Sequence, residues 1–135
     1  MDSETTADAL PLDHLTILAR DPDGSRAFYD LVLPHLGFSK HGKDIWRNAL
    51  GLHIQLRGAK RETREYERYG PGLNHFGFTA PDAAFVEALA AMVSEAGHVA
   101  RLQRFPDGTM AVFLPDPDGL RIEVSWYPPG VPPVE

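Results

Sequence analysis

The chain has 135 residues, of which 43% are hydrophobic, and this is the size and composition of one folded domain with its own core. Its formal net charge of -6 argues against nucleic acid or an anionic membrane surface as a partner, because both bind concentrated Lys and Arg. The sequence has no cysteine and no run of roughly 18 apolar residues, which excludes disulfides, thiolate metal ligands and a membrane span, so we expect a soluble cytoplasmic protein.

The first regular pattern follows a patternless start, residues 1–9, which we expect to be flexible. Over residues 12–19 apolar and polar positions alternate, with Ile17 and Ala19 on one face and His14 on the other. This period of two predicts a strand that carries a histidine on its less apolar side.

A short helix is predicted next. Residues 21–25, DPDGS, carry short oxygen-bearing side chains that accept hydrogen bonds from the free N–H groups of a first helical turn. The buried stripe of this helix is predicted from apolar residues at helical spacing, Phe28, Leu31 and Val32. Residues 38–48 and 51–57 are expected to add further strands, and the last of these contains the sequence GLHIQL.

A charged segment, residues 58–72, interrupts this pattern and ends in Gly-Pro-Gly. Its density of Lys, Arg and Glu is incompatible with a buried core, so we interpret it as a solvated linker between two halves of the chain. The alternative is a mobile flap over a pocket, in which Tyr66 and Tyr69 would touch a ligand.

The second half of the chain repeats the first. The segment LNHFGFTAPD aligns with LDHLTILARD, so that a constant spacing of 61 residues separates His14 from His75 and Asp21 from Asp82. A second helix is predicted to begin at Asp82 and to end at Gly97. Its expected buried stripe comprises Phe85, Leu89, Met92, Val93 and Ala96.

Three strands complete the second half, at residues 99–105, 110–114 and 120–126. Turn-forming PDG and PDPDG sequences separate them. The last strand, GLRIEV, nearly copies GLHIQL, and Glu123 therefore stands at the repeat position of Gln55.

These elements predict a single α+β domain, residues 1–135, made of two tandem βαβββ modules. The first module covers residues 12–57 and the second residues 73–127, with the linker 58–72 between them and a proline-rich tail, 128–135, after them. A lone module would leave one sheet face uncovered, so we expect the two curved mixed sheets to enclose a cavity. The tail is expected to be extended or disordered, or alternatively to pack on a neighbouring subunit.

Four polar residues occupy matched positions of the repeat: His14 and His75 on the opening strands, and Gln55 and Glu123 on the closing strands. All four lie on the less apolar face, which would line the cavity. Two imidazoles and a carboxylate that converge from different strands can hold a divalent metal and leave coordination positions open, with Gln55 as a fourth, neutral oxygen. The alternative for each residue is a hydrogen-bonded structural role.

Two more residues, His53 and Arg121, share a repeat position on the same face. Either is a candidate to orient a ligand or to donate a proton, and Tyr66 of the linker is a third catalytic candidate. For His53 and Arg121 we favour the alternative that they belong to a partly exposed polar face.

The segments LDHLTILARD, SRAFYDLVLPHLGF, LNHFGFTAPD and FLPDPDGLRIEV resemble the vicinal oxygen chelate superfamily, and the resemblance covers about residues 12–127. This superfamily includes glyoxalase I, fosfomycin and bleomycin resistance proteins, extradiol dioxygenases and methylmalonyl-CoA epimerase. The resemblance implies a glyoxalase-like fold of paired βαβββ modules, commonly a homodimer. It also implies a divalent metal, Fe, Mn, Ni or Zn, held by the residues that match its ligands, His14, His75 and Glu123.

Gln55 departs from the pattern of bacterial glyoxalase I-like proteins, which place a second glutamate at this position. Metal-bound carboxylates are expected to move the substrate proton there, and a carboxamide cannot act as a base near neutral pH. The departure argues against true lactoylglutathione lyase activity. The remaining His, His, Glu set is closer to the thiol-transferase and dioxygenase branches.

Two functions are therefore expected. The first is a metal-dependent lyase, thiol transferase or dioxygenase that binds two neighbouring oxygens of a small substrate to a divalent metal. The second is a metal-free dimer that sequesters a small-molecule antibiotic, and its stacking candidates are Trp46, Tyr66, Tyr69, Phe113 and Trp126. A vestigial cavity is a weaker third possibility.

Overall fold

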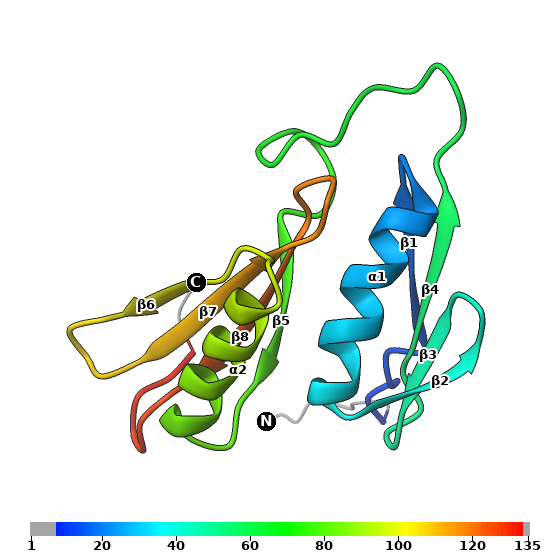
Figure 1. Cartoon of the computed structure of the whole chain (residues 1–135). Helices are drawn as coiled ribbons and strands as arrows, with labels where there is room; N and C mark the ends of the chain where they lie inside the picture. Colours follow the sequence, from blue (N-terminus) through cyan, green and yellow to red (C-terminus); the bar gives the residue numbers. More distant parts are fainter. Residues whose placement is uncertain (1–7, 134–135) are drawn as a thin grey trace.

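The computed structural model describes residues 8–133 and consists of two βαβββ modules, each a four-stranded mixed sheet with one helix (Figure 1). The first module contains β1 (His14–Ala19), α1 (Pro22–Val32), a 3-10 turn (Leu33–Leu36), β2 (Phe38–Gly42), β3 (Ile45–Asn48) and β4 (His53–Gly58). The second contains β5 (His75–Thr79), α2 (Ala83–Glu95), β6 (Arg101–Arg104), β7 (Met110–Pro115) and β8 (Arg121–Trp126). The predicted α+β fold of two repeated modules is confirmed.

The two sheets have the same strand order, β1-β4-β3-β2 and β5-β8-β7-β6. In each, the opening strand pairs in parallel with the closing strand, and the other neighbours are antiparallel. Thr16 stands opposite Gln55, and Gly77 stands opposite Glu123. Because successive strand residues point to opposite faces, the polar positions of β1 and β4, or of β5 and β8, share one face.

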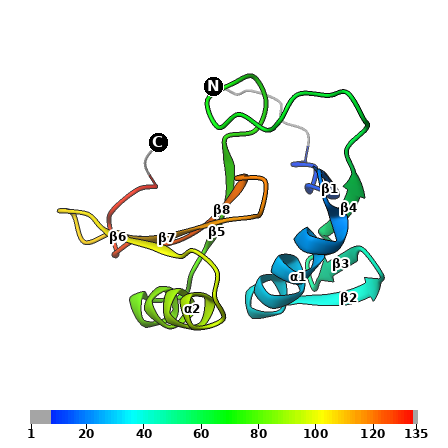
Figure 2. The ribbon, with the colours of Figure 1, turned by 45° about the horizontal axis from the view of Figure 1, so that its top comes forward.

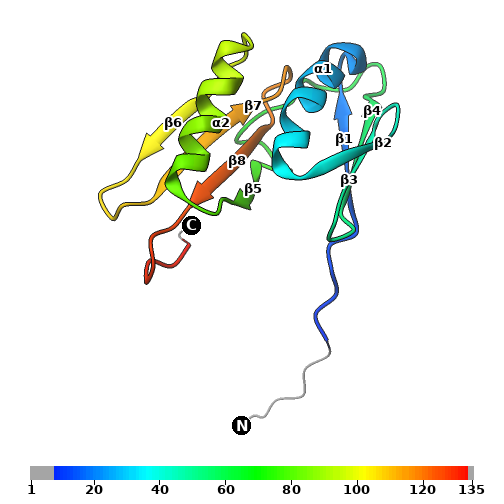
Figure 3. The same cartoon turned by 60° about the horizontal axis from the view of Figure 1, so that its bottom comes forward.

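The helices α1 and α2 lie beside each other, each against its own sheet (Figure 2). The rings of Phe28 and His98 meet between them, with centroids 5.8 Å apart. None of the helices in the described part of the chain covers the opposite face of either sheet, and we call these the open faces. Strands β1 and β5 run in opposite directions (Figures 1 and 3), so the starts of the two strands lie at opposite ends of the molecule.

One hydrophobic core joins both modules, and its largest fully buried side chains include Trp46, Tyr29 and Phe28. The rings of Phe38 and Phe78 meet between the modules, with centroids 5.8 Å apart. These contacts fix the two modules relative to each other.

The buried stripe of α2 differs from the prediction. The buried residues are Val86, Leu89, Ala90 and Val93, whereas Phe85 and Met92 are half-buried and Ala96 is exposed. The buried side of the helix is thus rotated relative to the prediction and includes Ala90, while Phe85 and Met92 border a cavity next to His35 of the first module. The start and end of α2 agree with the prediction: Asp82 accepts a hydrogen bond from the Phe85 N–H, and Gly97 has a left-handed φ of 93°.

Outside the modules, residues 59–74 contain no helix or strand, and the tail makes a turn in which Val131 N–H donates to Pro128 O (3.0 Å). Most of the predicted flexible start, and the last two residues of the tail, lie outside the described residues. None of the helices in residues 8–133 is long and apolar enough to cross a membrane.

Candidate metal and ligand site

The open face of the second module carries a close pair of side chains, a histidine and a glutamate, of the types that can bind a metal. His75 begins β5 and Glu123 lies in the middle of β8, and their Nε2 and Oε1 atoms are 2.9 Å apart. The other oxygen of Glu123 accepts a hydrogen bond from the Ser125 hydroxyl. Gly77, opposite Glu123, has no side chain to crowd it. We call these two residues the His75–Glu123 pair.

The residue before His75 determines which of its ring nitrogens carries a proton. The Asn74 side-chain oxygen accepts from Arg121 Nη2 (2.8 Å), and its side-chain nitrogen donates to Arg68 O (2.7 Å). The orientation of the amide is thereby fixed. His75 Nδ1, at 2.6 Å from that same oxygen, must therefore be a donor, and the Nε2 atom is directed at Glu123.

The pair fits a divalent metal with nitrogen and oxygen ligands. A neutral His75 would turn its Nε2 lone pair toward a carboxylate oxygen, so the contact requires either a second proton or a cation between the two atoms. Two ligands at about 2.0–2.2 Å from one metal and at right angles to each other are about 3.0 Å apart. The observed 2.9 Å matches this separation, and a hydrogen bond from the second ring nitrogen is the usual support of a metal-bound histidine.

The open face of the first module carries the matching residues. His14, His53 and Gln55 line a cavity of about 290 Å³ with Asp13 and Ile45. His14 Nδ1 lies 2.8 Å from the Asp13 carboxylate, and that hydrogen bond is the main reason why the pKa of Asp13 is lowered. His14 thus has the same arrangement as His75, with its second nitrogen supported by the preceding residue.

The other two side chains of this face have partners as well. His53 Nδ1 lies 3.1 Å from the Gly51 carbonyl, which leaves its Nε2 directed away from the backbone. The Gln55 side-chain oxygen accepts a hydrogen bond from the Thr16 hydroxyl (3.2 Å). This hydrogen bond holds the Gln55 carboxamide against the neighbouring strand β1.

The structure does not bring the two histidine positions together in one chain. His14 begins β1 and His75 begins β5, and these two strands run in opposite directions (Figure 3). Within residues 8–133, no group of three or more His, Asp or Glu side chains is close enough to hold a metal ion. The ligand set His14, His75, Glu123 and Gln55 therefore stays a prediction.

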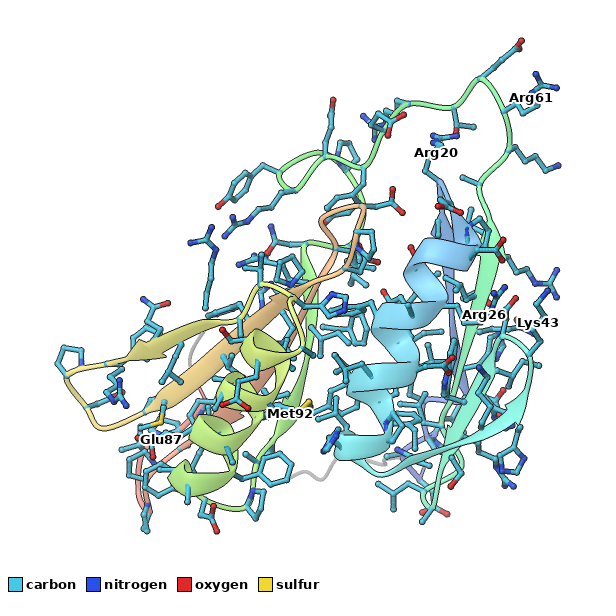
Figure 4. All side chains as sticks on the ribbon, viewed as in Figure 1. Arg20, Arg26, Lys43, Arg61, Glu87 and Met92 are labelled. Atoms are coloured by element: carbon cyan, nitrogen blue, oxygen red, sulfur yellow. The ribbon has the colours of Figure 1, made fainter. Side chains whose placement is uncertain are left out.

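The linker is attached to the first module by Arg20, whose side chain reaches it in Figure 4. Arg20 Nη1 donates to Lys60 O (3.2 Å), and Nη2 donates to the carbonyls of Thr63 (3.1 Å) and Arg64 (3.2 Å). Nothing in the sequence around Arg20 indicated that its side chain would bind the backbone of the linker.

The remaining candidates have defined places. The Tyr66 hydroxyl lies 2.7 Å from Leu73 O and 3.0 Å from Asn74 O, so it holds the linker against the start of β5. Trp46 was one of the candidates to stack on a ligand, and for this residue the prediction is wrong. It is fully buried in the core, with its indole N–H donating to Asp30 (3.0 Å), because it pairs with the core residue Ile54.

The sequence prediction missed Asp13 and Asn74, which orient the two histidines. The signal was present, because both residues precede a matched histidine at the same repeat position. Their side chains are short hydrogen-bond acceptors in both copies, although one is charged and the other neutral.

Two βαβββ modules with matched His, Gln and Glu residues on their open faces define a glyoxalase-like protein of the vicinal oxygen chelate type. The chain belongs to the Glyoxalase/Bleomycin resistance protein/Dioxygenase superfamily, whose family model matches residues 11–124. It is 28% identical over 125 residues to "Uncharacterized protein YqjT" of Bacillus subtilis (strain 168), and this match covers 84% of the chain and 96% of that protein.

Solved structures share the fold. A glyoxylase/bleomycin resistance protein/dioxygenase domain from Frankia sp. EAN1pec has a TM-score of 0.70 at 21% identity, covering 90% of this chain and 100% of that chain. Lactoylglutathione lyase from Agrobacterium tumefaciens has a TM-score of 0.64 at 22% identity, covering 89% and 96%. At these identities the similarity shows the fold alone.

Proposed function

We propose that the protein is a metal-dependent enzyme that acts on a small molecule with two neighbouring oxygens. The observation that carries the proposal is the His75–Glu123 pair, whose facing atoms are 2.9 Å apart while the other ring nitrogen is fixed by Asn74. A divalent cation bound there would polarise the two substrate oxygens and stabilise the negative charge that develops on them.

We further propose that two copies of the chain complete each site. His14 and Gln55 would come from one chain, and the His75–Glu123 pair from its partner. This proposal is supported by the placement of His14 and His75 at opposite ends of the folded molecule, on faces that none of the helices in residues 8–133 covers. A twofold dimer brings two different patches of a chain together twice, and so would form two equal sites.

The residues of the chain have separate tasks in this site. His14, His75 and Glu123 would hold the cation, while Asp13 and Asn74 keep each imidazole turned with Nε2 available. Gln55 would contribute a neutral oxygen or a hydrogen bond to the substrate. A carboxamide does not accept a proton near neutral pH, so Gln55 is not expected to take a proton from the substrate as a glutamate at this position could.

Metal content tests the proposal. The full chain, purified without chelator and then loaded with Fe(II), Mn(II), Ni(II) or Zn(II), is expected to bind one ion per chain with at least one of these metals. The His75→Ala variant is expected to lose at least nine-tenths of it, because an essential nitrogen ligand is removed. His35→Ala is the matched control, since it removes an exposed imidazole of the 3-10 turn outside both open faces. The proposal fails if the wild type binds no stoichiometric metal or if His75→Ala binds as much as the control.

The second candidate is a metal-free binding protein that sequesters an aromatic ligand. It is favoured by Phe113, whose ring is half-buried on the open face and lies 6.0 Å from the His75 ring. Ligand binding that persists unchanged after chelation, together with the absence of metal, would support this candidate over the first.

A further inference from the structure

We propose that Arg121 binds an anionic group of the substrate next to the His75–Glu123 pair, so that the substrate carries a carboxylate or a phosphonate besides its two neighbouring oxygens. The inference concerns the same site as the proposed function and rests on it for the identity of the reacting oxygens. The anion-binding step itself needs no metal and is tested without one.

Arg121 is held in a fixed position relative to His75. The two residues are partners in the register of β5 and β8, and Glu123 follows Arg121 on the same face. Arg121 Nη2 donates to the side-chain oxygen of Asn74 (2.8 Å), which also accepts from His75 Nδ1 (2.6 Å). One amide oxygen therefore orients both the guanidinium and the imidazole.

The charge of Arg121 has no counter-ion among the described residues. Its one hydrogen-bond partner there is the neutral Asn74, and Glu123 is occupied by His75 and Ser125. Neither Nε nor Nη1 of Arg121 has a hydrogen-bond partner among the described residues. The Nε–H group is buried, and Nη1 is not enclosed. The enclosed Nε–H is costly to leave unpaired, and the open Nη1 group, which water can reach, is available to the oxygens of a ligand.

Arg26 and Arg121 are the two half-buried arginines among the described residues. Arg26, labelled in Figure 4, forms ion pairs with Asp44 and Asp23. Arg104 pairs with Glu87 at 2.9 Å. Exposed arginines such as Arg47 and Arg57 also lack an ion pair among the described residues, but their guanidinium groups are solvated. Of the two half-buried guanidinium groups, that of Arg26 is neutralised by carboxylates and that of Arg121 is not.

The guanidinium also lies over an aromatic ring. Its central carbon lies 5.0 Å from the centroid of the Phe113 ring, and the same ring meets His75 edge to face. The hydrogen bond to Asn74 and the contact with Phe113 hold the guanidinium in place, and its free N–H groups suit the oxygens of a carboxylate or a phosphonate. These two groups share this chemistry, and separate probes distinguish them.

The experiment titrates the metal-free full chain with acetate, with methylphosphonate and with the neutral compound hydroxyacetone. The arginine Nε–H signals are followed by ¹⁵N-edited NMR. We expect a saturable shift of the Arg121 signal with at least one of the two anions and none with hydroxyacetone. Whichever anion binds more tightly identifies the substrate class.

Two variants complete the test. Arg121→Gln is expected to raise the dissociation constant of the anion at least tenfold. Arg61→Gln, which removes the same charge from a linker side chain that points away from the sheets in Figure 4, is expected to leave it unchanged. Equal affinity in both variants, or shifts spread over many arginines without saturation, would overturn the inference. The wild-type titration decides the question by itself should Arg121→Gln fail to fold.

Failure of this inference is distinguishable from failure of the proposed function. Metal that binds stoichiometrically while the anions do not bind at Arg121 would overturn the inference alone. Saturable anion binding at Arg121 in a protein that never takes up metal would support the anion site and overturn the metal-dependent function.

Discussion

Tyr29 and Asp116 form a buried hydrogen bond that joins the two modules. The Tyr29 hydroxyl on α1 donates to Asp116 Oδ2 (2.6 Å) in the turn before β8. The other oxygen of Asp116 accepts from the backbone N–H groups of Asp118, Gly119 and Leu120. Burial raises the pKa of Asp116, and the hydrogen bond from Tyr29 opposes this increase by stabilising the carboxylate.

The Tyr29→Phe variant is expected to lower the free energy of unfolding by about 1.5–3 kcal/mol at neutral pH, because the buried carboxylate loses a donor while the ring remains in the core. Without that donor, the folded-state pKa of Asp116 rises further, so the variant binds a proton more readily than the wild type. The loss of stability is therefore full above the pKa of Asp116 and shrinks as the pH falls through it. Urea unfolding at about pH 7 and about pH 4 measures this difference.

The control for this experiment is Tyr127→Phe, because Tyr127 is half-buried and none of the hydrogen bonds among the described residues involves its hydroxyl. Its unfolding free energy is expected to stay within about 0.5 kcal/mol of the wild type. A loss in Tyr29→Phe that equals the control, or that does not change with pH, would contradict the assigned role of the pair.

At the scale of the elements, the two helices show how equal sequence positions acquire different contacts. Asp21 and Asp82 precede α1 and α2 at matched repeat positions. Asp82 accepts a hydrogen bond from the Phe85 N–H (2.8 Å), as predicted, whereas the Asp21 side chain makes no capping bond. Pro22 occupies the first turn of α1, and it both starts the helix and lacks an N–H group.

This difference predicts unequal costs for the same substitution. Asp82→Ala is expected to lower the free energy of unfolding by about 1 kcal/mol, because the first turn of α2 loses its cap. Asp21→Ala is expected to cost less than about 0.5 kcal/mol. Parallel urea titrations of the two variants measure the difference, and equal losses would show that the capping bond is not what stabilises α2.

Much of the structure of the individual strands and helices could be predicted from the sequence. The faces of β1, β4, β5 and β8 were predictable because alternation of period two continues over each of these strands. Strand β3, which contains Trp46, has four residues, too few for the apolar pattern to show which of its side chains face the core. Trp46 was therefore wrongly counted among the residues that could stack on a ligand. The rotation of α2 was also missed, because alanine positions carry little information about which side of a helix is buried.

At the scale of the whole molecule, the arrangement of the modules decides which polar residues can meet. The repeat predicted that His14, His75, Gln55 and Glu123 are equivalent, but equivalence within a module does not determine how modules face each other. In the structure the opening strands of the two modules, β1 and β5, run in opposite directions, and the helices of residues 8–133 leave both open faces uncovered. The relative orientation depends on contacts between distant segments, such as Tyr29 with Asp116, which have no local sequence signal.

A mixing experiment tests whether sites form between copies. His14→Ala and His75→Ala homodimers are each expected to lack stoichiometric metal, since every site loses a ligand. After the two variants are unfolded together and refolded, half of the dimers contain one of each chain, and each of these has one intact site. About a quarter of the wild-type metal content should therefore return. Sites built within a single chain would give no recovery, and metal analysis of the refolded mixture decides between the two.

The joining of two modules in one chain has a consequence for how the site can diversify. A dimer of separate single modules would be encoded by one short gene, so any substitution would change both symmetry-related positions at once. Here the corresponding positions have separate codons, and they already differ: Asp13 corresponds to Asn74, and Gln55 to Glu123. Each half therefore has one charged and one neutral residue at these positions, Asp13 with Gln55 in the first and Asn74 with Glu123 in the second, and each position can change without altering its counterpart or the shared fold.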